Sequence, residues 1–425
     1  PKGCRAMKIK NTRRQFLRLL GITAPSLFMM QRLAAQIPDT IKPGIGPYPD
    51  SWLPDGIRSR FVENINGLRI HLLEAGHESG DRPVLVLLHG FPELAYSWRK
   101  IMLPLANSGY HVIAPDLRGY GRTTGWSSDY ETDLTPFRML NKVRDVMGLI
   151  YAYGYDHVDC VVGHDFGSPL AAWCAVTRPD VFRSVVLMSA PFTGTPTIPT
   201  NTIGNLRTAI REPNIYDELE NLPRPRKHYQ RYYQTRDANQ NMWKAEQGLS
   251  NFIRAYYHYK SADWADNKPR PLAERSATEW AKMPTYYIMD LADGMAETVA
   301  SVMPSNEVVA GNSWLTDSDL SVYVNEFGRT GFQGGLNSYR MGATGIGAAE
   351  LQLYAGKTID QPSLFISGAS DWGTYQNPGA LDRMQDTACT DMRGVHIVEG
   401  AGHWVQQEQP QITAKLILEF LKQLY

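Results

Sequence analysis

An aspartate stands at the centre of the stretch GHDFGS, residues 163–168, where an apolar strand-like run ends and a helical pattern begins. Gly163 and Gly167 flank Asp165 at two residues on either side. A sharp strand-to-helix turn needs small residues there, because the central residue takes strained dihedrals that bring the two backbones close together. A carboxylate at the tip of such a turn is already ionised at neutral pH and can attack an electrophilic carbon directly. The pattern alone also fits an ordinary turn whose aspartate caps the helix.

Two further side chains follow Asp165 in the order expected for a hydrolytic triad: nucleophile, acid, histidine. Asp371 comes after the strand-like SLFISGAS, and His403 lies in GAGHWVQQEQP, between the last strand and the final helix. Each alone reads as a turn residue or a surface group. The loop after the sixth strand, SAPFTGTPTIPTN, has no carboxylate, so Asp371 is expected to orient His403.

Backbone donors can be placed as well. The stretch HGFPE, residues 89–93, ends another apolar run. We expect the N–H groups of Phe91 and Phe166 to point into the crevice above Asp165 and form an oxyanion hole. The alternative for HGFPE is a tight turn built on Gly90 and Pro92.

Apolar strand-like segments alternate with helical ones along most of the chain, which predicts a doubly wound, mostly parallel eight-stranded α/β sheet. The expected strands are 58–64, 68–74, 84–89, 111–115, 158–162, 184–189, 363–367 and 395–398. The expected core helices are 95–107, 135–153, 167–176 and 411–424.

The alternation stops from about residue 191 to about residue 356. We interpret 192–356 as a mainly helical cap inserted into a core of 57–191 and 357–425, covering the strand ends where ligands bind in open α/β sheets. Its aromatic residues predict an apolar cavity, with the packing core of the cap itself as the alternative; they include Trp243, Phe252, Tyr256, Tyr257, Trp264, Tyr286 and Tyr287.

Charge and cysteine content exclude several classes of protein. The 425 residues carry 43 basic and 43 acidic side chains. Eight of the basic residues and none of the acidic ones lie within 1–38, so the remainder has a formal charge of −8. This argues against nucleic-acid binding. The four cysteines show neither close pairing nor metal-ligand spacing, so we expect neither a disulfide scaffold nor a metal site.

Residues 1–38 are predicted to be a signal and lead segment. Arg13 and Arg14 follow Thr12, and 19–30 is an uncharged run too short to span a bilayer as a helix. The segment resembles a twin-arginine export signal, which implies a periplasmic or secreted bacterial protein. A basic amphipathic surface helix is the alternative, and cleavage after Ala35 is not specified by a clean A-x-A site.

From about Arg58 onward the sequence resembles the epoxide hydrolases of the α/β-hydrolase fold, in particular the soluble epoxide hydrolase group. The motifs that carry the resemblance span core and cap; they are HGFPELAYSWR, PDLRGYGRT, GHDFGS, LTDSDLSVYVNEFGRTGFQGGLNSYRM and GAGHWVQQEQP. The resemblance implies Asp165 as nucleophile, His403 as base and Asp371 as its partner. It also implies a small hydrophobic epoxide substrate, no metal or organic cofactor, and peripheral or no membrane contact; it leaves the oligomeric state open.

The resemblance further implies two cap tyrosines that hold the epoxide oxygen. Tyr339 in GLNSYRM matches the second. Tyr229 in KHYQRYYQ is our choice for the first, with Tyr232 and Tyr233 as alternatives in register. Two neighbours of the motif residues, Trp404 and Pro92, are expected to line the substrate pocket. The sequence departs from the family at Phe166, where similar proteins commonly have tryptophan.

Two other interpretations use the same fold. Haloalkane or haloacid dehalogenases have a similar aspartate and cap, but they need indole N–H donors for a halide, or basic residues for a carboxylate, and Phe166 offers neither. A catalytically silent ligand-binding relative would not need Asp165, Asp371 and His403 together.

Overall fold

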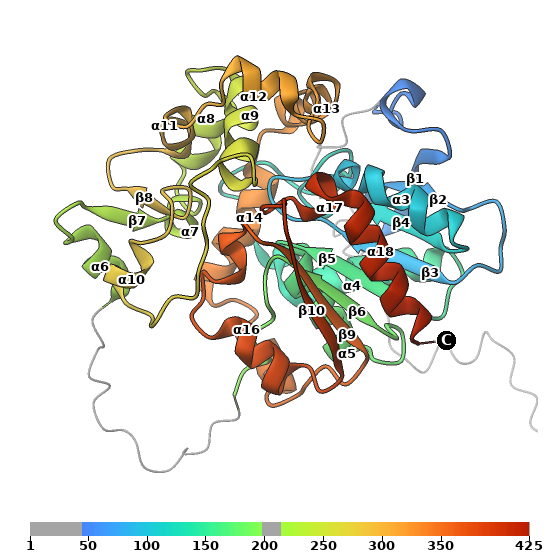
Figure 1. Ribbon diagram of the computed structural model, residues 1–425. Coiled ribbons are helices and arrows are strands. Elements are labelled where there is room, and N and C mark those ends of the chain that lie inside the picture. The colour runs from blue at the N-terminus through green and yellow to red at the C-terminus, as the bar shows by residue number, and fades with distance from the viewer. Residues whose placement is uncertain (1–44, 198–213, 425) are drawn as a thin grey trace, which may run out of the picture. The chain divides into compact units, whose positions relative to one another are not determined.

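The computed structural model describes residues 45–197 and 214–424, and its centre is an eight-stranded sheet in the order β1-β2-β4-β3-β5-β6-β9-β10 (Figure 1). The strands are β1 (Ile57–Ile65), β2 (Leu68–Ala75), β3 (Val84–Leu88), β4 (His111–Pro115), β5 (Cys160–His164), β6 (Val185–Met188), β9 (Ser363–Gly368) and β10 (Met392–Val398). β2 runs antiparallel to β1 and β4, and the other pairs are parallel. The predicted fold class is confirmed.

Helices cover both faces of this sheet. α3 (Arg99–Asn107) packs with α18 (Pro410–Lys422), and α4 (Met139–Ala152) packs with α5 (Gly167–Thr177). Strand β3 is buried along its whole length because Leu85 and Leu87 join the cluster on the α3 and α18 face, whereas Val84, Val86 and Leu88 join the cluster under α4 and α5. A strand whose side chains alternate between two apolar layers reads as an unbroken hydrophobic run, as this one does.

The segment between β6 and β9 is mainly helical, as expected, but it also contains a two-stranded antiparallel sheet that the sequence did not predict. Its elements are α6 (Ile215–Glu220), β7 (Arg226–His228), α7 (Tyr229–Tyr232), α8 (Asp237–Trp243), α9 (Leu249–Lys260), α10 (Ala277–Trp280), β8 (Ile288–Asp290), α11 (Met295–Ala300), α12 (Asn306–Gly311), α13 (Asp317–Thr330), α14 (Gln333–Thr344) and α15 (Ala348–Leu351). Figure 1 shows α6 to α13 grouped beside the sheet, with α14 between them and the strands. The proposed cap boundaries at 192 and 356 stay a prediction.

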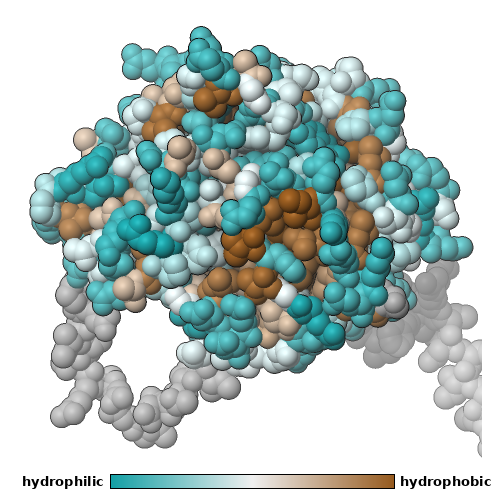
Figure 2. Space-filling view, viewed as in Figure 1, coloured by the Kyte–Doolittle hydropathy of each residue, from teal (hydrophilic) through white to brown (hydrophobic). Residues whose placement is uncertain are grey.

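β10 is the edge strand of the sheet and is only partly buried. Figure 2 shows apolar surface gathered where β10 and α18 lie, and Ile397 and Ile412 on these elements are among the exposed large aliphatic residues. Because an edge strand borders a single neighbour, it needs no continuous apolar run. The expected strand 395–398 was therefore three residues short at its beginning.

The N-terminal prediction for 1–38 lies outside the described residues. Among the helices that the structure describes, none has both the length and the apolar character to cross a membrane. In the same part of the chain, no cluster of three or more histidine, cysteine or acidic side chains could hold a metal ion.

Candidate active site

Asp165 sits on the sharp turn between β5 and α5, with a left-handed φ of 51°. A Cβ at Gly163 would come within 2.0 Å of the Gly167 carbonyl oxygen, and one at Gly167 would come within 2.0 Å of the Leu88 carbonyl oxygen. Glycine is therefore required at both flanking positions, as the sequence pattern predicted. Backbone strain at a non-glycine residue is costly and persists where the surroundings enforce it.

Asp371 and His403 meet Asp165 at the carboxyl ends of the strands. His403 Nδ1 lies 3.1 Å from Asp371 Oδ1, and His403 Nε2 lies 3.4 Å from Asp165 Oδ2. The side chain of Asp165 is 16% exposed, against 2% for His403 and 1% for Asp371. Asp165, the most exposed of the three side chains, is thus the one that would have to reach a substrate.

The two carboxylates and the imidazole set each other's protonation. Burial raises the pKa of Asp165, but His403 and Lys260 outweigh it and hold that pKa far below its usual range. Burial also raises the pKa of Asp371, and His403 with the Ser189 hydroxyl brings it below normal. Both acids are therefore ionised. For His403, burial and Lys260 lower the pKa, while Asp371 and Asp165 raise it to a net value above the ordinary one.

One donor of the expected oxyanion hole is in place. The Phe91 N–H donates to Asp165 Oδ1 over 2.9 Å. Gly90 lets the strand-end turn approach so closely, since a Cβ there would lie 2.3 Å from the Asp165 Cβ. Phe166 is the N-cap of α5, and no hydrogen bond from its N–H is found among the described residues, so its part in the hole stays a prediction.

Tyr339 on α14 lies directly above the turn. Its ring packs edge-on against Phe166 at 4.6 Å and against Phe91 at 5.5 Å between centroids. The Tyr229 ring, at the start of α7, lies 5.9 Å from the Tyr339 ring. Burial, with a contribution from Asp165, raises the pKa of both tyrosines, so both stay protonated and able to donate.

The hydroxyl groups of the other two candidate tyrosines have partners elsewhere. Tyr232 donates to Asn241 Oδ1 over 2.7 Å, and Tyr233 donates to the Tyr256 hydroxyl over 3.2 Å. The Tyr229 hydroxyl accepts from Gln230 Nε2 over 3.2 Å and so keeps its own proton free to donate; burial raises the pKa of Tyr229, and Gln230 and then Tyr339 lower it. The geometry thus favours Tyr229 as the first tyrosine.

The two expected pocket residues are buried beside the site but bond to the cap. The Trp404 indole N–H donates to the Tyr257 carbonyl oxygen over 2.8 Å, and the Trp404 ring stacks on the Tyr257 ring with 4.2 Å between centroids. The Pro92 carbonyl oxygen accepts from the Tyr257 hydroxyl over 3.0 Å. Both residues hold α9 against the site, and their contact with substrate stays a prediction.

Sequence reasoning missed Ser189, which follows β6 with a φ of 68°. Its hydroxyl donates to Asp371 Oδ2 and lies 3.1 Å from His403 Nδ1. A carboxylate was the expected partner of His403, so a hydroxyl after β6 was not predicted. A hydroxyl there stabilises the ionised acid, and a small polar residue directly after β6 was the available signal.

A buried acid–histidine pair behind the triad was also missed. His164, one residue before the nucleophile, has Nδ1 2.6 Å from Glu93 Oε2 and Nε2 2.7 Å from the His403 carbonyl oxygen. Glu408 holds the same loop from the other side, accepting from the N–H groups of Gly402 and Trp404, both over 2.9 Å. His164 and Glu408 both lie inside quoted motifs; the partners of His164 are far away in the sequence, whereas Glu408 folds back on its own loop.

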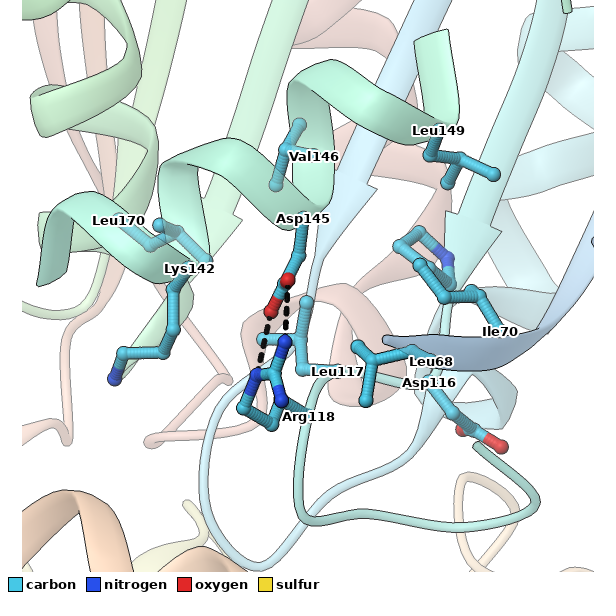
Figure 3. Close-up of a pocket in the computed structure, with 11 residues that line it drawn as sticks. Leu68, Ile70, Asp116, Leu117, Arg118, Lys142, Asp145, Val146, Leu149 and Leu170 are labelled. Carbon is cyan, nitrogen blue, oxygen red and sulfur yellow. Dashed lines mark hydrogen bonds and ion pairs between the residues drawn. The ribbon is translucent and has the colours of Figure 1, made fainter. Parts of the chain in front are cut away.

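The motif PDLRGYGRT builds a support for the site rather than part of it. Arg118 makes two bonds to Asp145 on α4, of 2.8 and 2.7 Å, beside a small pocket of about 10 Å³ (Figure 3). That volume holds about one water molecule. None of the expected catalytic residues lines this pocket, which lies between the sheet and α4. Asp116 of the same motif accepts from the Ala95 and Arg122 N–H groups and so fixes the loops around it.

Comparisons with known proteins agree with this geometry. The family model described as alpha/beta hydrolase fold matches residues 83–410. Epoxide hydrolase B of Mycobacterium tuberculosis is 33% identical over 366 residues, covering 85% of this chain and 97% of the relative. The chain belongs to the epoxide hydrolases of the α/β-hydrolase fold. Epoxide hydrolase 3 of Siraitia grosvenorii is 31% identical, covering 84% of this chain and 96% of its own.

Solved structures of this family resemble the chain over nearly their whole length. An epoxide hydrolase from an endophytic Streptomyces is 31% identical with a TM-score of 0.68, covering 87% of this chain and 97% of that one. Potato (Solanum tuberosum) epoxide hydrolase I is 29% identical with a TM-score of 0.63, covering 86% and 99%. The family assignment favours the epoxide interpretation over the dehalogenase and silent-relative interpretations.

Proposed function

We propose that this protein hydrolyses small hydrophobic epoxides to vicinal diols through a covalent ester on Asp165. The observation that carries the proposal is the different environment of the two carboxylate oxygens. Oδ1 accepts the Phe91 N–H, whereas Oδ2 lies 3.4 Å from His403 Nε2 and accepts no hydrogen bond from any other group in the described part of the chain. One oxygen is thus held by a backbone donor while the other is open to attack carbon.

In the first half-reaction, Asp165 Oδ2 attacks an epoxide carbon from the side opposite the ring oxygen, and the carbon–oxygen bond breaks. Tyr229 and Tyr339 lie on the cap side of the turn and donate to the leaving oxygen, one of them transferring a proton to it. The product is a hydroxyalkyl ester of Asp165.

In the second half-reaction, His403 Nε2 takes a proton from water, and the hydroxide attacks the ester carbonyl carbon of Asp165. Asp371 stabilises the resulting imidazolium across its 3.1 Å contact. Negative charge develops on Oδ1, where the Phe91 N–H already points. Collapse releases the diol, whose new hydroxyl takes the proton held by His403; the proton left on the Asp165 carboxyl returns to the tyrosine, and Asp165 keeps one oxygen from water.

Isotope labelling tests this route. In a single turnover in ¹⁸O-water with enzyme in excess, the label should appear in the Asp165 peptide by mass spectrometry. Label in the diol alone would show direct attack of water on the epoxide and reject the ester.

Trapping tests the second step. Replacement of His403 by Gln should leave alkylation in place and let an adduct of the substrate's mass accumulate on Asp165. The variant Asp165→Asn is the control, because its amide should show no adduct. A panel of aromatic and aliphatic epoxides, assayed for diols, would define the substrate class.

We also propose export by the twin-arginine route, supported by the paired Arg13 and Arg14 ahead of an uncharged run. In a bacterial host, the wild-type protein should reach the periplasmic fraction. The double change of both arginines to lysine should retain it in the cytoplasm; unchanged fractionation would contradict the proposal.

A further inference from the structure

Lys260, the last residue of α9, has a buried ammonium group with no role in the mechanism above. Its side chain is 3% exposed. Its Nζ lies between 4.8 and 5.7 Å from the centroids of four rings, those of Tyr256, Tyr286, Tyr287 and Trp404. Within residues 45–197 and 214–424, no carboxylate lies within 4.0 Å of this nitrogen and no hydrogen bond from it is found. Its charge is therefore stabilised by ring faces and is not neutralised at contact.

The same residue is fixed next to the candidate base. The Lys260 carbonyl oxygen accepts the His403 N–H over 2.8 Å, so α9 ends against the loop that carries the imidazole. Nζ is 5.7 Å from the Trp404 ring, whose centroid is 4.6 Å from the His403 ring. These two distances place the ammonium no farther than about 10 Å from the imidazole, and the buried Trp404 ring lies close to both.

Charged groups from several elements face this ammonium. Burial brings the pKa of Lys260 below its ordinary value, and three carboxylates oppose this effect: Asp165 after β5, Asp371 after β9 and Glu93 after β3. The carboxylates thus favour its charged form. In turn, two causes lower the pKa of His403: burial is the larger, and the charge of Lys260 is the next.

The surrounding tyrosines add no charge. Burial raises the pKa of Tyr256, Tyr286 and Tyr287, so all three are neutral. The ring box formed by these tyrosines and Trp404 is neutral, so the ammonium is the only charged group among them. His164 is a further titratable side chain beyond His403, with 5.0 Å between the centroids of the two imidazoles.

We propose that Lys260 is a positioning residue that keeps the His403 imidazole neutral while Asp165 is esterified. The proposal rests on the proposed function. The base can take a proton from water only when its Nε2 is free, and the ionised Asp371 favours the protonated form. Esterification removes the charge of Asp165 from the site, and Asp371 and Glu93 then remain as the carboxylates that raise the pKa of Lys260 and favour its charged form. An unneutralised cation in a medium of low polarity opposes a second cation nearby.

The test follows the decay of the alkyl-enzyme in single turnovers as a function of pH. Lys260→Met removes the charge, Lys260→Gln removes the charge but keeps a polar N–H group in the ring box, and Lys260→Arg keeps the charge. Lys415→Met, at an exposed lysine of α18, is the matched control for loss of a charge. Alkylation is measured separately in every variant.

We expect the acidic limb of ester hydrolysis to move to higher pH by about one unit in the Met and Gln variants, and by less in the Arg and Lys415 variants. Below that limb, the two uncharged variants should hydrolyse the ester about tenfold more slowly than wild type. A merely structural lysine would change the rate at all pH values without moving the limb.

An unshifted limb in either folded uncharged variant would overturn the role of Lys260. If wild type forms no alkyl-enzyme and no diol with any epoxide, the proposed function itself fails, and the two results are distinguishable. A shift in the Arg variant as large as in the Met variant would likewise reject a role for the charge.

Discussion

At the scale of single residues, the proposed mechanism assigns to the hydroxyl groups of Tyr229 and Tyr339 the choice of what Asp165 can open. A nucleophilic aspartate serves several reactions, but a ring oxygen leaves readily only when a donor meets it. Tyr229 and Tyr339 have neighbouring rings, and burial keeps both protonated. Tyr232 and Tyr233, which follow shortly after Tyr229 in the sequence, have hydroxyl groups that donate to other residues, and they serve as internal controls.

The first prediction follows from this difference. Changing Tyr229 or Tyr339 to Phe should slow alkylation by Asp165 by roughly 10- to 100-fold, and changing both should slow it by about 10²- to 10⁴-fold, because a general acid is lost. Stopped-flow measurement of the single-turnover alkylation rate checks this. The matched changes at Tyr232 and Tyr233 should cost less than either. A larger loss at Tyr233 than at Tyr229 would reassign the first donor.

Part of the site could be predicted at this scale and part could not. Asp165, Asp371 and His403 could be found because chain order and strand ends place them independently of packing. Ser189 left only the signal of a small polar residue directly after β6 and Lys260 left none, because each makes its contacts with residues more than 100 positions away. No local spacing reports such contacts.

At the scale of elements, the backbone of α14 lies directly against the backbone of the core. A Cβ at Gly334 would lie 2.0 Å from the Gly119 carbonyl oxygen, and a Cβ at Gly119 would lie 2.5 Å from that of Gly334. The helix that carries Tyr339 therefore touches the PDLRGYGRT loop with nothing between them. This contact fixes how closely α14, which carries Tyr339, approaches the core.

The second prediction compares two glycines of this helix. Gly334→Ala should push α14 away from the loop and lower the alkylation rate on the order of 10- to 100-fold, since small displacements of a catalytic group are costly. Gly342→Ala on the same helix has nothing within 4 Å of its new methyl group. It should raise stability by up to about 1 kcal/mol and leave the alkylation rate near that of wild type. Equal rates in the two variants would show that the contact does not position Tyr339.

The elements themselves were predictable where their burial is regular. Core strands such as β3 and β4 begin where expected, because both faces are covered and the apolar run is continuous. The three-residue strands β7 and β8 show no such run, and their pairing joins segments about 60 residues apart. Tertiary packing of aromatic side chains, rather than local pattern, holds the cap together.

At the scale of the whole molecule, buried acids tie loops that are distant in sequence. Asp116 is 1% exposed and accepts from the N–H groups of Ala95 and Arg122 and from His71 Nδ1 at 2.6 Å. Burial raises its pKa, but His71 and these donors outweigh it and bring the pKa to about 2. The ionised form is therefore favoured by folding.

The third prediction concerns acid stability. A carboxyl group with a lowered folded-state pKa contributes stability above its unfolded pKa and loses it as the pH falls toward the folded value. Asp116→Asn should therefore cost about 2 kcal/mol or more at pH 7, and the cost should shrink between pH 4 and pH 2. Urea unfolding across that range checks this. The exposed Asp382, changed to Asn, controls for loss of a negative charge; a cost at Asp116 that is independent of pH would contradict the linkage.

The apolar interior shared by α3, α18 and the cap limits how the cap can be exchanged in protein engineering. The apolar cluster on the α3 and α18 face continues without a break into the cap and includes Ile101, Ile417, Phe252 and Leu320. Exchanging only the cap between relatives would set foreign side chains against half of an existing interior. A working chimera should therefore carry the facing residues of α3 and α18 with the graft, and recombination points chosen from chain connectivity alone should yield insoluble protein.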